Sequence, residues 1–233
     1  MKFHRFITQF NLDKKKIIIT EKELVHQIDK VLRLTPGEQI ILGDEASNEL
    51  LAEIVSVGKS VECRVLEQRK NEVESERFVT LYCSILKKDN FDLVVQKATE
   101  VGVKRIVPLI CERTIKKDVN LERLNKIARE AAEQSGRLFV PVISAPLKIK
   151  DAVIQAKEND LNIVFQMVNK EFENKLLKSK KKVGVFIGTE GGWTEREIVL
   201  MTENDFLALS LGKTTLRGET AAIIGTYLAC RYE

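Results

Sequence analysis

The stretch Ile187-Gly188-Thr189-Glu190-Gly191-Gly192-Trp193-Thr194 decides how the rest of the sequence is interpreted. It follows an apolar run at 183–187 and precedes a helical pattern in which Thr194 and Glu197 have the spacing of a capping box. The local order is therefore strand, glycine loop, helix. Three glycines in five residues allow the backbone to approach a ligand closely, and the following helix directs free N–H groups toward the loop. A glycine-rich turn and a ligand site explain this stretch equally well.

A second loop of the same kind follows the next apolar run, with the sequence Leu211-Gly212-Lys213-Thr214-Thr215-Leu216-Arg217-Gly218-Glu219-Thr220. Ligands of open α/β sheets bind beyond the carboxyl ends of the strands, and both loops occur there. Two such loops leading into consecutive helices favour a pocket over two coincidental turns. The sequence lacks both GxGxxG with a suitably spaced acidic residue and GxxxxGK[ST], which argues against a dinucleotide fingerprint and a P-loop. The loops suit a neutral or zwitterionic ligand bound mostly by backbone groups.

Apolar runs alternate with helical patterns from residue 79 onward. The runs are at 79–86, 105–110, 161–166, 183–187 and 206–211, and the helical patterns are at 89–101, 121–136, 151–158, 195–202 and 219–231. This alternation predicts a mainly parallel sheet with helices on both faces.

The first seventy residues show a different pattern. Short strands are expected at 16–20, 39–43, 50–57 and 60–66. Thr20 and Glu23 have capping-box spacing, which predicts one amphipathic helix that runs up to Pro36-Gly37. The polar stretch 69–77 marks the boundary between the two patterns. We therefore expect a β-rich domain at 1–70 and an α/β domain at 77–233.

The composition is that of an ordinary globular protein. The 233 residues are 44% hydrophobic and 31% charged, with a net charge of +4, which permits an anionic partner without requiring one. Because no signal peptide or membrane span is recognisable, a cytoplasmic protein is expected. Four cysteines without a CxxC pair and two distant histidines predict free thiols and no metal site.

Five stretches, taken together and in order, match a known family. They are Val31-Leu32-Arg33, the segment from Lys88 to Gly102 that contains Gln96-Lys97-Ala98-Thr99-Glu100, the segment Glu130-Ala131-Ala132-Glu133-Gln134-Ser135-Gly136-Arg137, and the two glycine loops. On these residues the chain resembles, over nearly its whole length, the ribosomal RNA small subunit methyltransferase E family, uridine-N3 methyltransferases of the SPOUT superfamily. Two residues depart from the family pattern, because Thr189 stands where Pro is usual and Gly218 stands where Thr or Ala is usual.

The resemblance implies an architecture, a cofactor and a substrate. It implies a PUA-like β-barrel followed by a SPOUT-type α/β domain with a C-terminal trefoil knot, which general folding rules treat as exceptional. The implied cofactor is S-adenosyl-L-methionine, and the implied assembly is a homodimer with its site close to the partner subunit. The implied substrate is a uridine in small-subunit (16S) ribosomal RNA, within the assembled subunit.

The resemblance also implies site residues. The cofactor-binding residues that it implies are Gly188, Glu190, Gly191, Gly192, Leu211, Gly212 and Leu216. Arg217 is the candidate for stabilising the anion of the uracil imide, and the alternative is that it pairs with Glu190 or Glu219 and only fixes the loop. Glu190 and Glu219 are candidates for the general base or for orienting Arg217. The alternative for Glu219 is a capping role at the start of the last helix. Trp193 either stacks near the pocket or packs beside the loop. Positioning of the reactants ranks above acid–base catalysis.

Basic residues in both domains are candidates for RNA phosphate contacts, with a solvated surface as the alternative for each of them. They are Arg5, Lys30, Arg33, Lys87, Lys88, Lys97, Arg113, Lys116, Lys117 and Arg137. Two other functions stay open at this point. The same fold could act on another RNA, such as transfer RNA, or the chain could be a non-catalytic RNA-binding protein that keeps the loops as structure.

Overall fold

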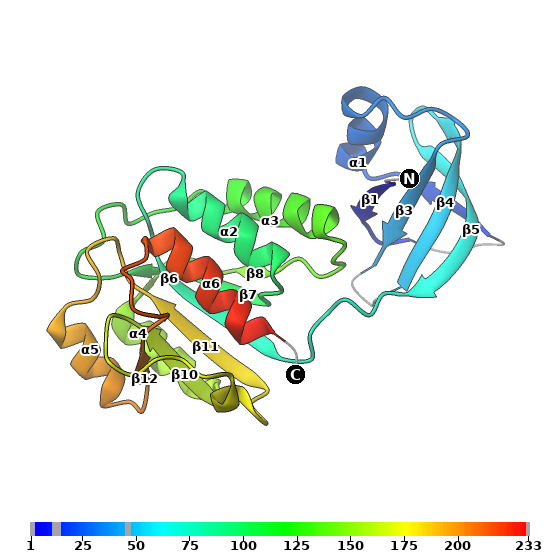
Figure 1. The fold of residues 1–233 in the computed structure, drawn as a ribbon. Coiled ribbons are helices and arrows are strands. Elements are labelled where there is room, and N and C mark those ends of the chain that lie inside the picture. Colours follow the sequence, from blue (N-terminus) through cyan, green and yellow to red (C-terminus); the bar gives the residue numbers. More distant parts are fainter. Residues whose placement is uncertain (1–2, 11–14, 45–47, 232–233) are drawn as a thin grey trace. The chain divides into compact units, whose positions relative to one another are not determined.

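The computed structural model describes residues 3–10, 15–44 and 48–231 (Figure 1). The chain divides into two compact units. The first contains the residues up to Glu74 together with Ala132–Phe139, and the second contains Ser75–Ala131 and Val140–Glu233. Both glycine loops belong to the second unit.

The first unit is built on a five-stranded sheet in the order β1-β3-β4-β5-β2. The strands are β1 (His4–Ile7), β2 (Lys16–Ile19), β3 (Gln39–Gly43), β4 (Asn48–Val57) and β5 (Val61–Lys70). All neighbouring pairs are antiparallel except β1 and β3, which run parallel. Phe6, Ile40 and Leu50 belong to its buried apolar core. The four predicted strands are confirmed, whereas the sequence pattern does not indicate β1, because this strand combines two basic and two apolar residues.

The helix of the first unit is shorter than expected and begins differently. It consists of α1 (Lys22–His26) and a π-helical turn, η1 (Gln27–Val31). The predicted capping box of Thr20 and Glu23 is wrong, because Glu21 occupies the N-cap and makes no side-chain capping bond. One carboxylate oxygen of Glu21 instead accepts a hydrogen bond from Thr8 Oγ1 at 3.2 Å. The helix ends before the expected Pro36, as the chain turns through Arg33 with a φ of 53°.

The second unit contains a seven-stranded sheet in which every pair is parallel, as predicted. The order is β12-β10-β11-β6-β7-β8, with β9 also paired to β7. The strands are β6 (Phe78–Ser84), β7 (Arg105–Ile110), β8 (Val142–Ile143), β9 (Leu147–Lys148), β10 (Leu161–Phe165), β11 (Lys182–Ile187) and β12 (Leu207–Leu209). The carboxyl ends of β10, β11 and β12 therefore meet at one edge of the sheet.

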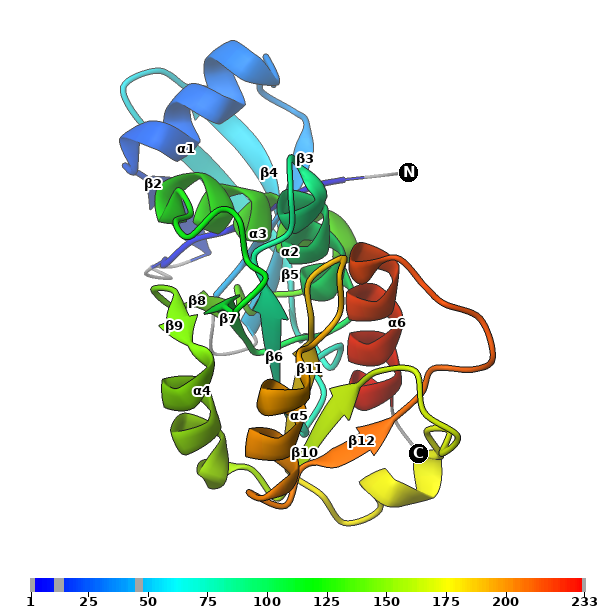
Figure 2. The same cartoon turned by 90° about the vertical axis from the view of Figure 1, so that its left-hand side faces the viewer.

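Helices cover both faces of this sheet, which confirms the predicted α/β arrangement (Figure 2). The helices are α2 (Asn90–Glu100), α3 (Leu121–Ser135), α4 (Ile149–Gln155), α5 (Glu195–Thr202) and α6 (Gly218–Cys230), with 3₁₀ turns η2 (Ala156–Glu158) and η3 (Asn174–Leu177). On one face, Val94 of α2 and Ala222 of α6 join a core that includes Val185. On the other face, Val153 of α4 and Met201 of α5 join a second core.

Helix α6 approaches the sheet closely at Gly225. A Cβ atom at this position would lie 2.8 Å from Cε2 of Phe165 and 3.5 Å from Val185. Phe165 is the last residue of β10 and lines the pocket described below. A glycine is therefore needed here for α6 to pack beside the site.

Replacing Gly225 by valine is expected to lower the free energy of unfolding by about 1–3 kcal/mol, because the added side chain overpacks the helix–sheet contact. Urea unfolding followed by the emission of Trp193, which lies in the same unit, measures the change. Gly58→Ala is the control, since its added Cβ meets nothing within 4 Å. An unfolding midpoint of Gly225→Val equal to that of the control would contradict the packing account.

Candidate functional site

The loops that follow β10, β11 and β12 surround a pocket of about 440 Å³. Its lining is contributed by Phe165, Gln166, Met167, Ile187, Gly188, Thr189, Glu190, Gly191, Gly192, Trp193, Leu211, Thr214, Thr215, Leu216, Gly218 and Ala221. The wall combines apolar side chains, small residues and one carboxylate. Pockets for small organic ligands have volumes of roughly 300–1,000 Å³, so this one has room for a small organic cofactor.

The glycine loop after β11 is a closed turn. The backbone N–H of Gly192, whose φ is 71°, donates to the Thr189 carbonyl at 2.8 Å. Thr189 Oγ1 donates back to the Gly192 carbonyl at 3.2 Å. A proline at position 189 would restrict the φ angle of that residue. Thr189 instead closes the turn with a hydrogen bond from its side chain.

Trp193 packs beneath this loop. It is 9% exposed, and its Nε1 donates to the carbonyl of Phe165 at 3.2 Å. A Cβ at Gly188 would lie 3.1 Å from the indole ring, so the glycine lets the loop rest directly on the ring. Trp193 therefore links the ends of β10 and β11 and also forms part of the pocket wall.

The predicted capping box at the start of α5 is confirmed. Thr194 accepts a hydrogen bond from the Glu197 backbone, and the Glu197 carboxylate accepts one from the Thr194 backbone at 2.9 Å. Glu197 is only 4% exposed, and its other oxygen accepts the N–H of Glu112 at 2.8 Å. One buried carboxylate thus joins the glycine loop to the turn that follows β7.

Arg113 fastens the same two loops from the outside. Its guanidinium donates to the carbonyl of Gly191, and also to that of Trp193 at 3.4 Å. The turn that carries Arg113 is closed by Thr114 Oγ1, which accepts the N–H of Cys111 at 2.8 Å. Arg113 was expected to contact RNA phosphates, but in the structure it holds two carbonyls of the glycine loop.

The cysteines below the site are not suited to nucleophilic chemistry. Burial raises the pKa of Cys111 to about 12, an effect that the hydrogen bond with Ser84 partly offsets. Burial likewise raises the pKa of Cys83. Both thiols therefore stay protonated near neutral pH. Within residues 3–10, 15–44 and 48–231, no cluster of three or more His, Cys, Asp or Glu residues could hold a metal ion.

The second loop contributes to the pocket through Leu211, Leu216 and Gly218, while Gly212 lies elsewhere. Gly212, with a φ of 129°, borders an adjoining cavity of about 220 Å³ together with Ser210 and Glu171. Of the implied cofactor residues, Gly188, Glu190, Gly191, Gly192, Leu211 and Leu216 thus come together around the pocket. Gln166 and Met167 also line the pocket, but the sequence does not indicate them, because the segment after β10 has no glycine signature.

The three candidate catalytic residues occupy different environments. Arg217 is exposed at the N-cap of α6, and its guanidinium has no hydrogen bond or ion pair with the residues that the structure describes. Glu190 lines the pocket and accepts the backbone N–H of Lys87 at 2.9 Å. Glu219 is buried in the first turn of α6, where Asn90 Nδ2 donates to it at 3.4 Å. The alternative that Arg217 pairs with Glu190 or Glu219 is therefore not realised.

Two basic residues expected at an RNA surface are used inside the first unit. Arg137 is 2% exposed and holds Glu74 through two hydrogen bonds of 2.8 and 2.9 Å. Arg5 pairs with Glu49, a buried carboxylate that also accepts Arg69 Nε at 2.6 Å. Burial raises the pKa of Glu49, but hydrogen bonds from Asn71, Arg5 and Arg69 outweigh it, so that its pKa lies below the ordinary value. These guanidiniums stabilise the unit and are not free for phosphates.

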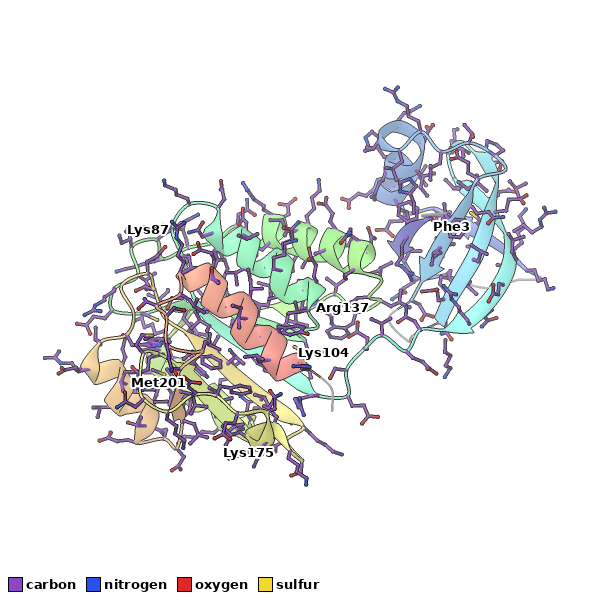
Figure 3. All side chains as sticks on the ribbon, in the orientation of Figure 1. Phe3, Lys87, Lys104, Arg137, Lys175 and Met201 are labelled. Atoms are coloured by element: carbon purple, nitrogen blue, oxygen red, sulfur yellow. The ribbon has the colours of Figure 1, made fainter. Side chains whose placement is uncertain are left out.

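The remaining basic candidates are more accessible. Lys30 pairs with Asp29, and Lys97 pairs with Glu100 one helical turn away. The others are exposed, and none of them has an ion pair among the described residues: Arg33, Lys87, Lys88, Lys116 and Lys117. Lys87 and Lys88 lie between β6 and α2. The backbone N–H of Lys87, which is labelled in Figure 3, contacts Glu190 of the glycine loop.

Two family models match the chain. One, described as an RNA methyltransferase domain, matches residues 73–229. The other, described as an RNA methyltransferase PUA domain, matches residues 23–66. Together they span most of both units.

Curated relatives and solved structures agree with these matches. The chain is 33% identical to the ribosomal RNA small subunit methyltransferase E of Rickettsia conorii, over 96% of this chain and 93% of the relative. It is 30% identical to the enzyme of that name from Bacillus subtilis, over 93% of this chain and 91% of the relative. A Neisseria gonorrhoeae ribosomal RNA small subunit methyltransferase E bound to S-adenosyl methionine superposes with a TM-score of 0.86 at 30% identity, covering 97% of this chain and 95% of that one. A Legionella pneumophila methyltransferase in complex with the same cofactor gives 0.86 at 29%, covering 97% and 96%.

Replacing Arg113 by alanine is expected to loosen the glycine loop, because two loop carbonyls lose their charged donor. Trp193 is the only tryptophan in the chain, so its emission should shift to the red and become more accessible to acrylamide. Arg113→Lys should keep part of the effect, and Arg196→Ala on the exposed side of α5 serves as a control. Emission and quenching of Arg113→Ala equal to those of the wild type would rule out a clamping role.

Proposed function

The chain belongs to the ribosomal RNA small subunit methyltransferase E family of S-adenosylmethionine-dependent enzymes, and we propose that it methylates N3 of a uridine in small-subunit (16S) ribosomal RNA. The observation that supports this most directly is the pocket at the carboxyl edge of the sheet. It is formed in part by the two loops that match the family motifs, and two similar methyltransferases, from Legionella pneumophila and Neisseria gonorrhoeae, have been solved with S-adenosyl methionine bound.

The residues around the pocket fit S-adenosylmethionine. Leu211, Leu216 and Phe165 supply apolar walls for an adenosine. The backbone N–H groups of Glu190 and Gly191 have no hydrogen-bond partner in the described part of the chain, so they are available as donors. The exposed carboxylate of Glu190 favours a ligand that carries positive charge.

The chain itself has to position the two reactants and stabilise the anion of the uracil imide. The bound cofactor supplies an electrophilic methyl group on a sulfonium sulfur. Methyl transfer to N3 would form the new N–C bond as the S–C bond breaks, and the N3 proton would have to leave the base. Since the imide is weakly acidic, its anion needs a fixed cation or aimed N–H groups. The unpaired guanidinium of Arg217 stands at the start of α6, one residue from the pocket wall at Gly218, and is suited to face the N3 and O4 edge of the base.

The target base must be presented unstacked, since N3 lies on the pairing edge of uracil. We propose Lys30, Arg33, Lys87, Lys88, Lys97, Lys116 and Lys117 as the phosphate contacts that hold the strand. The PUA-type unit provides a second RNA-binding surface, consistent with the family to which residues 23–66 match. Small-subunit RNA in the assembled subunit, in the cytoplasm, is the proposed setting.

We further propose the trefoil knot and the homodimer that the SPOUT superfamily implies. Ser210 donates from its backbone to Lys170 and accepts from Phe172, so the second loop runs beside the segment after β10 before it enters α6. Such a passage beside an earlier segment supports a knotted path. The outer face of α6 is apolar, with Ile224 and Tyr227 exposed, and a second copy of the chain would cover it.

The proposed function is tested with labelled S-adenosylmethionine and RNA substrates. Small ribosomal subunits and transfer RNA from cells lacking the enzyme are incubated separately with the protein, and nucleoside mass spectrometry locates the methyl group. N3-methyluridine in the small subunit is expected. Label in transfer RNA alone would refute the ribosomal substrate, and cofactor binding without transfer to either RNA would favour the non-catalytic alternative.

Arg217→Ala is expected to lower kcat by about 10²–10³-fold, since it removes the cation that stabilises the developing imide anion. Affinity for S-adenosylhomocysteine, measured by calorimetry, should change little, because the Arg217 side chain is not part of the pocket lining. Arg217→Lys should recover part of the rate. Unchanged turnover in Arg217→Ala would remove this residue from the catalytic step.

A further inference from the structure

The loop between β6 and α2 contacts both of the glycine loops that form the pocket. Its Lys87 backbone N–H donates to Glu190 Oε1 at 2.9 Å, which ties it to the loop after β11. Its Leu86 side chain lies against Gly218, where a Cβ would come within 3.0 Å of Leu86 Cδ2. Asn90, which follows the loop as the first residue of α2, donates to Glu219 at 3.4 Å. Residues 86–90 are therefore fastened at three points, and two of these are carboxylates.

The same loop presents two free cations. Lys87 and Lys88 are exposed, and neither has an ion pair with a described residue. Lys88 has a φ of 54°, which bends the chain sharply before α2. Figure 3 shows Lys87 on this loop at the start of α2. The backbone is thus held next to Glu190 of the pocket wall, while both lysine side chains are exposed.

The contacts of Glu190 and Glu219 fit a holding role better than proton abstraction. A general base must reach the proton that it removes, directly or through one water. Glu219 is buried and is not part of the pocket wall. Glu190 does line the pocket, but one of its oxygens already accepts the N–H of Lys87. An amide oxygen could accept that bond equally well, whereas a base requires the carboxylate.

We propose that residues 86–90 form the RNA-contacting lip of the methylation site, and that Glu190 and Glu219 are positioning residues that hold this lip beside the cofactor pocket. Lys87 and Lys88 then bind the phosphates next to the target uridine, and neither carboxylate takes the N3 proton. The inference rests on the proposed function for the identity of the RNA, but the tether itself is a property of the chain alone.

The lip also connects the two ligands. Glu190 belongs to the pocket wall and holds Lys87, and Gly218 belongs to the same wall and contacts Leu86. A cofactor that fixes these wall residues therefore fixes the lip, so the cofactor should raise RNA affinity, and RNA should raise cofactor affinity by the same factor. The unusual Gly218 fits this arrangement, because a larger residue would push against Leu86.

The tether is tested by hydrogen exchange and mass spectrometry of the full chain, without RNA. Glu190→Ala should speed exchange of the Lys87 amide, read in the peptide that spans 85–91, by about tenfold, while Glu190→Gln should keep it near the wild-type rate. Glu195→Ala, an exposed carboxylate outside the pocket lining, serves as the control. Wild-type exchange in Glu190→Ala would refute the tether, whether or not the protein methylates RNA.

The role of the lip is tested by fluorescence anisotropy with a labelled single-stranded RNA that contains uridine, in the presence of S-adenosylhomocysteine. The double variant Lys87→Ala, Lys88→Ala should have a shallower slope of log K against log salt concentration. The slope should fall by about 0.7 for each phosphate contact that is lost. Glu190→Ala should weaken binding about fivefold in the wild-type background and not at all in the double lysine variant. Additive losses would show that Glu190 does not act through the lysines.

Turnover separates the positioning role from a general base. Glu190→Gln removes a charge from the pocket wall and should raise the KM for S-adenosylmethionine, but at saturating cofactor the pH profile of kcat should keep its shape. If Glu190→Gln loses as much activity as Glu190→Ala and its pH profile becomes flat, Glu190 is the base and the proposal is wrong. If the wild type shows no methyl transfer at all, the proposed function fails, while the exchange and anisotropy results still decide the tether and the lip.

Discussion

The geometry of the site depends on one buried carboxylate, Glu197. It completes the capping box of α5 with Thr194 and accepts the backbone N–H of Glu112 on the turn after β7. Without it, the partly buried backbone N–H groups of Glu112 and Thr194 would lose their acceptor, and a hydrogen bond of this kind contributes about 1 kcal/mol. Arg113, on the same turn, then holds the carbonyls of Gly191 and Trp193. A loop so rich in glycine could adopt many backbone conformations, but in the fold these side chains hold it in one.

These contacts fix the positions of the loops at the carboxyl edge of the parallel sheet, so that the loops can form a defined pocket. The strands β10, β11 and β12 end at one edge, and Trp193, Thr189 and Arg113 hold the connecting segments in place. The pocket wall can then include four glycines, at positions 188, 191, 192 and 218, which give a ligand access to the backbone. Arg217 has no partner among the described residues, which fits the anion-stabilising role that we propose for it.

The sequence was most informative where the relevant interactions are local. The alternation of apolar runs and helical patterns predicted the parallel sheet, and Thr194 with Glu197 predicted the start of α5. The same spacing misled at Thr20 and Glu23, because Glu21 became the N-cap and bonded to Thr8 instead. Spacing shows that a cap is possible, but tertiary partners decide whether it forms.

Partners distant in sequence could not be predicted. Arg137 looked like a surface cation, yet it is buried against Glu74, 63 residues away. Arg113 looked like a phosphate ligand and instead holds a loop 78 residues further on. The pocket residues Gln166 and Met167 had no signal, because their place depends on the strand order β12-β10-β11 and not on local pattern.

We propose that the braced loops hold S-adenosylmethionine in the pocket against Trp193. Titrating the full chain with S-adenosylhomocysteine, while the emission of Trp193 is recorded, tests this directly because the chain has no other tryptophan. A saturable change with one ligand bound per chain, reversed by competition with S-adenosylmethionine analogues, is the predicted result. Binding by calorimetry without any change in Trp193 emission, or no binding at all, would contradict it.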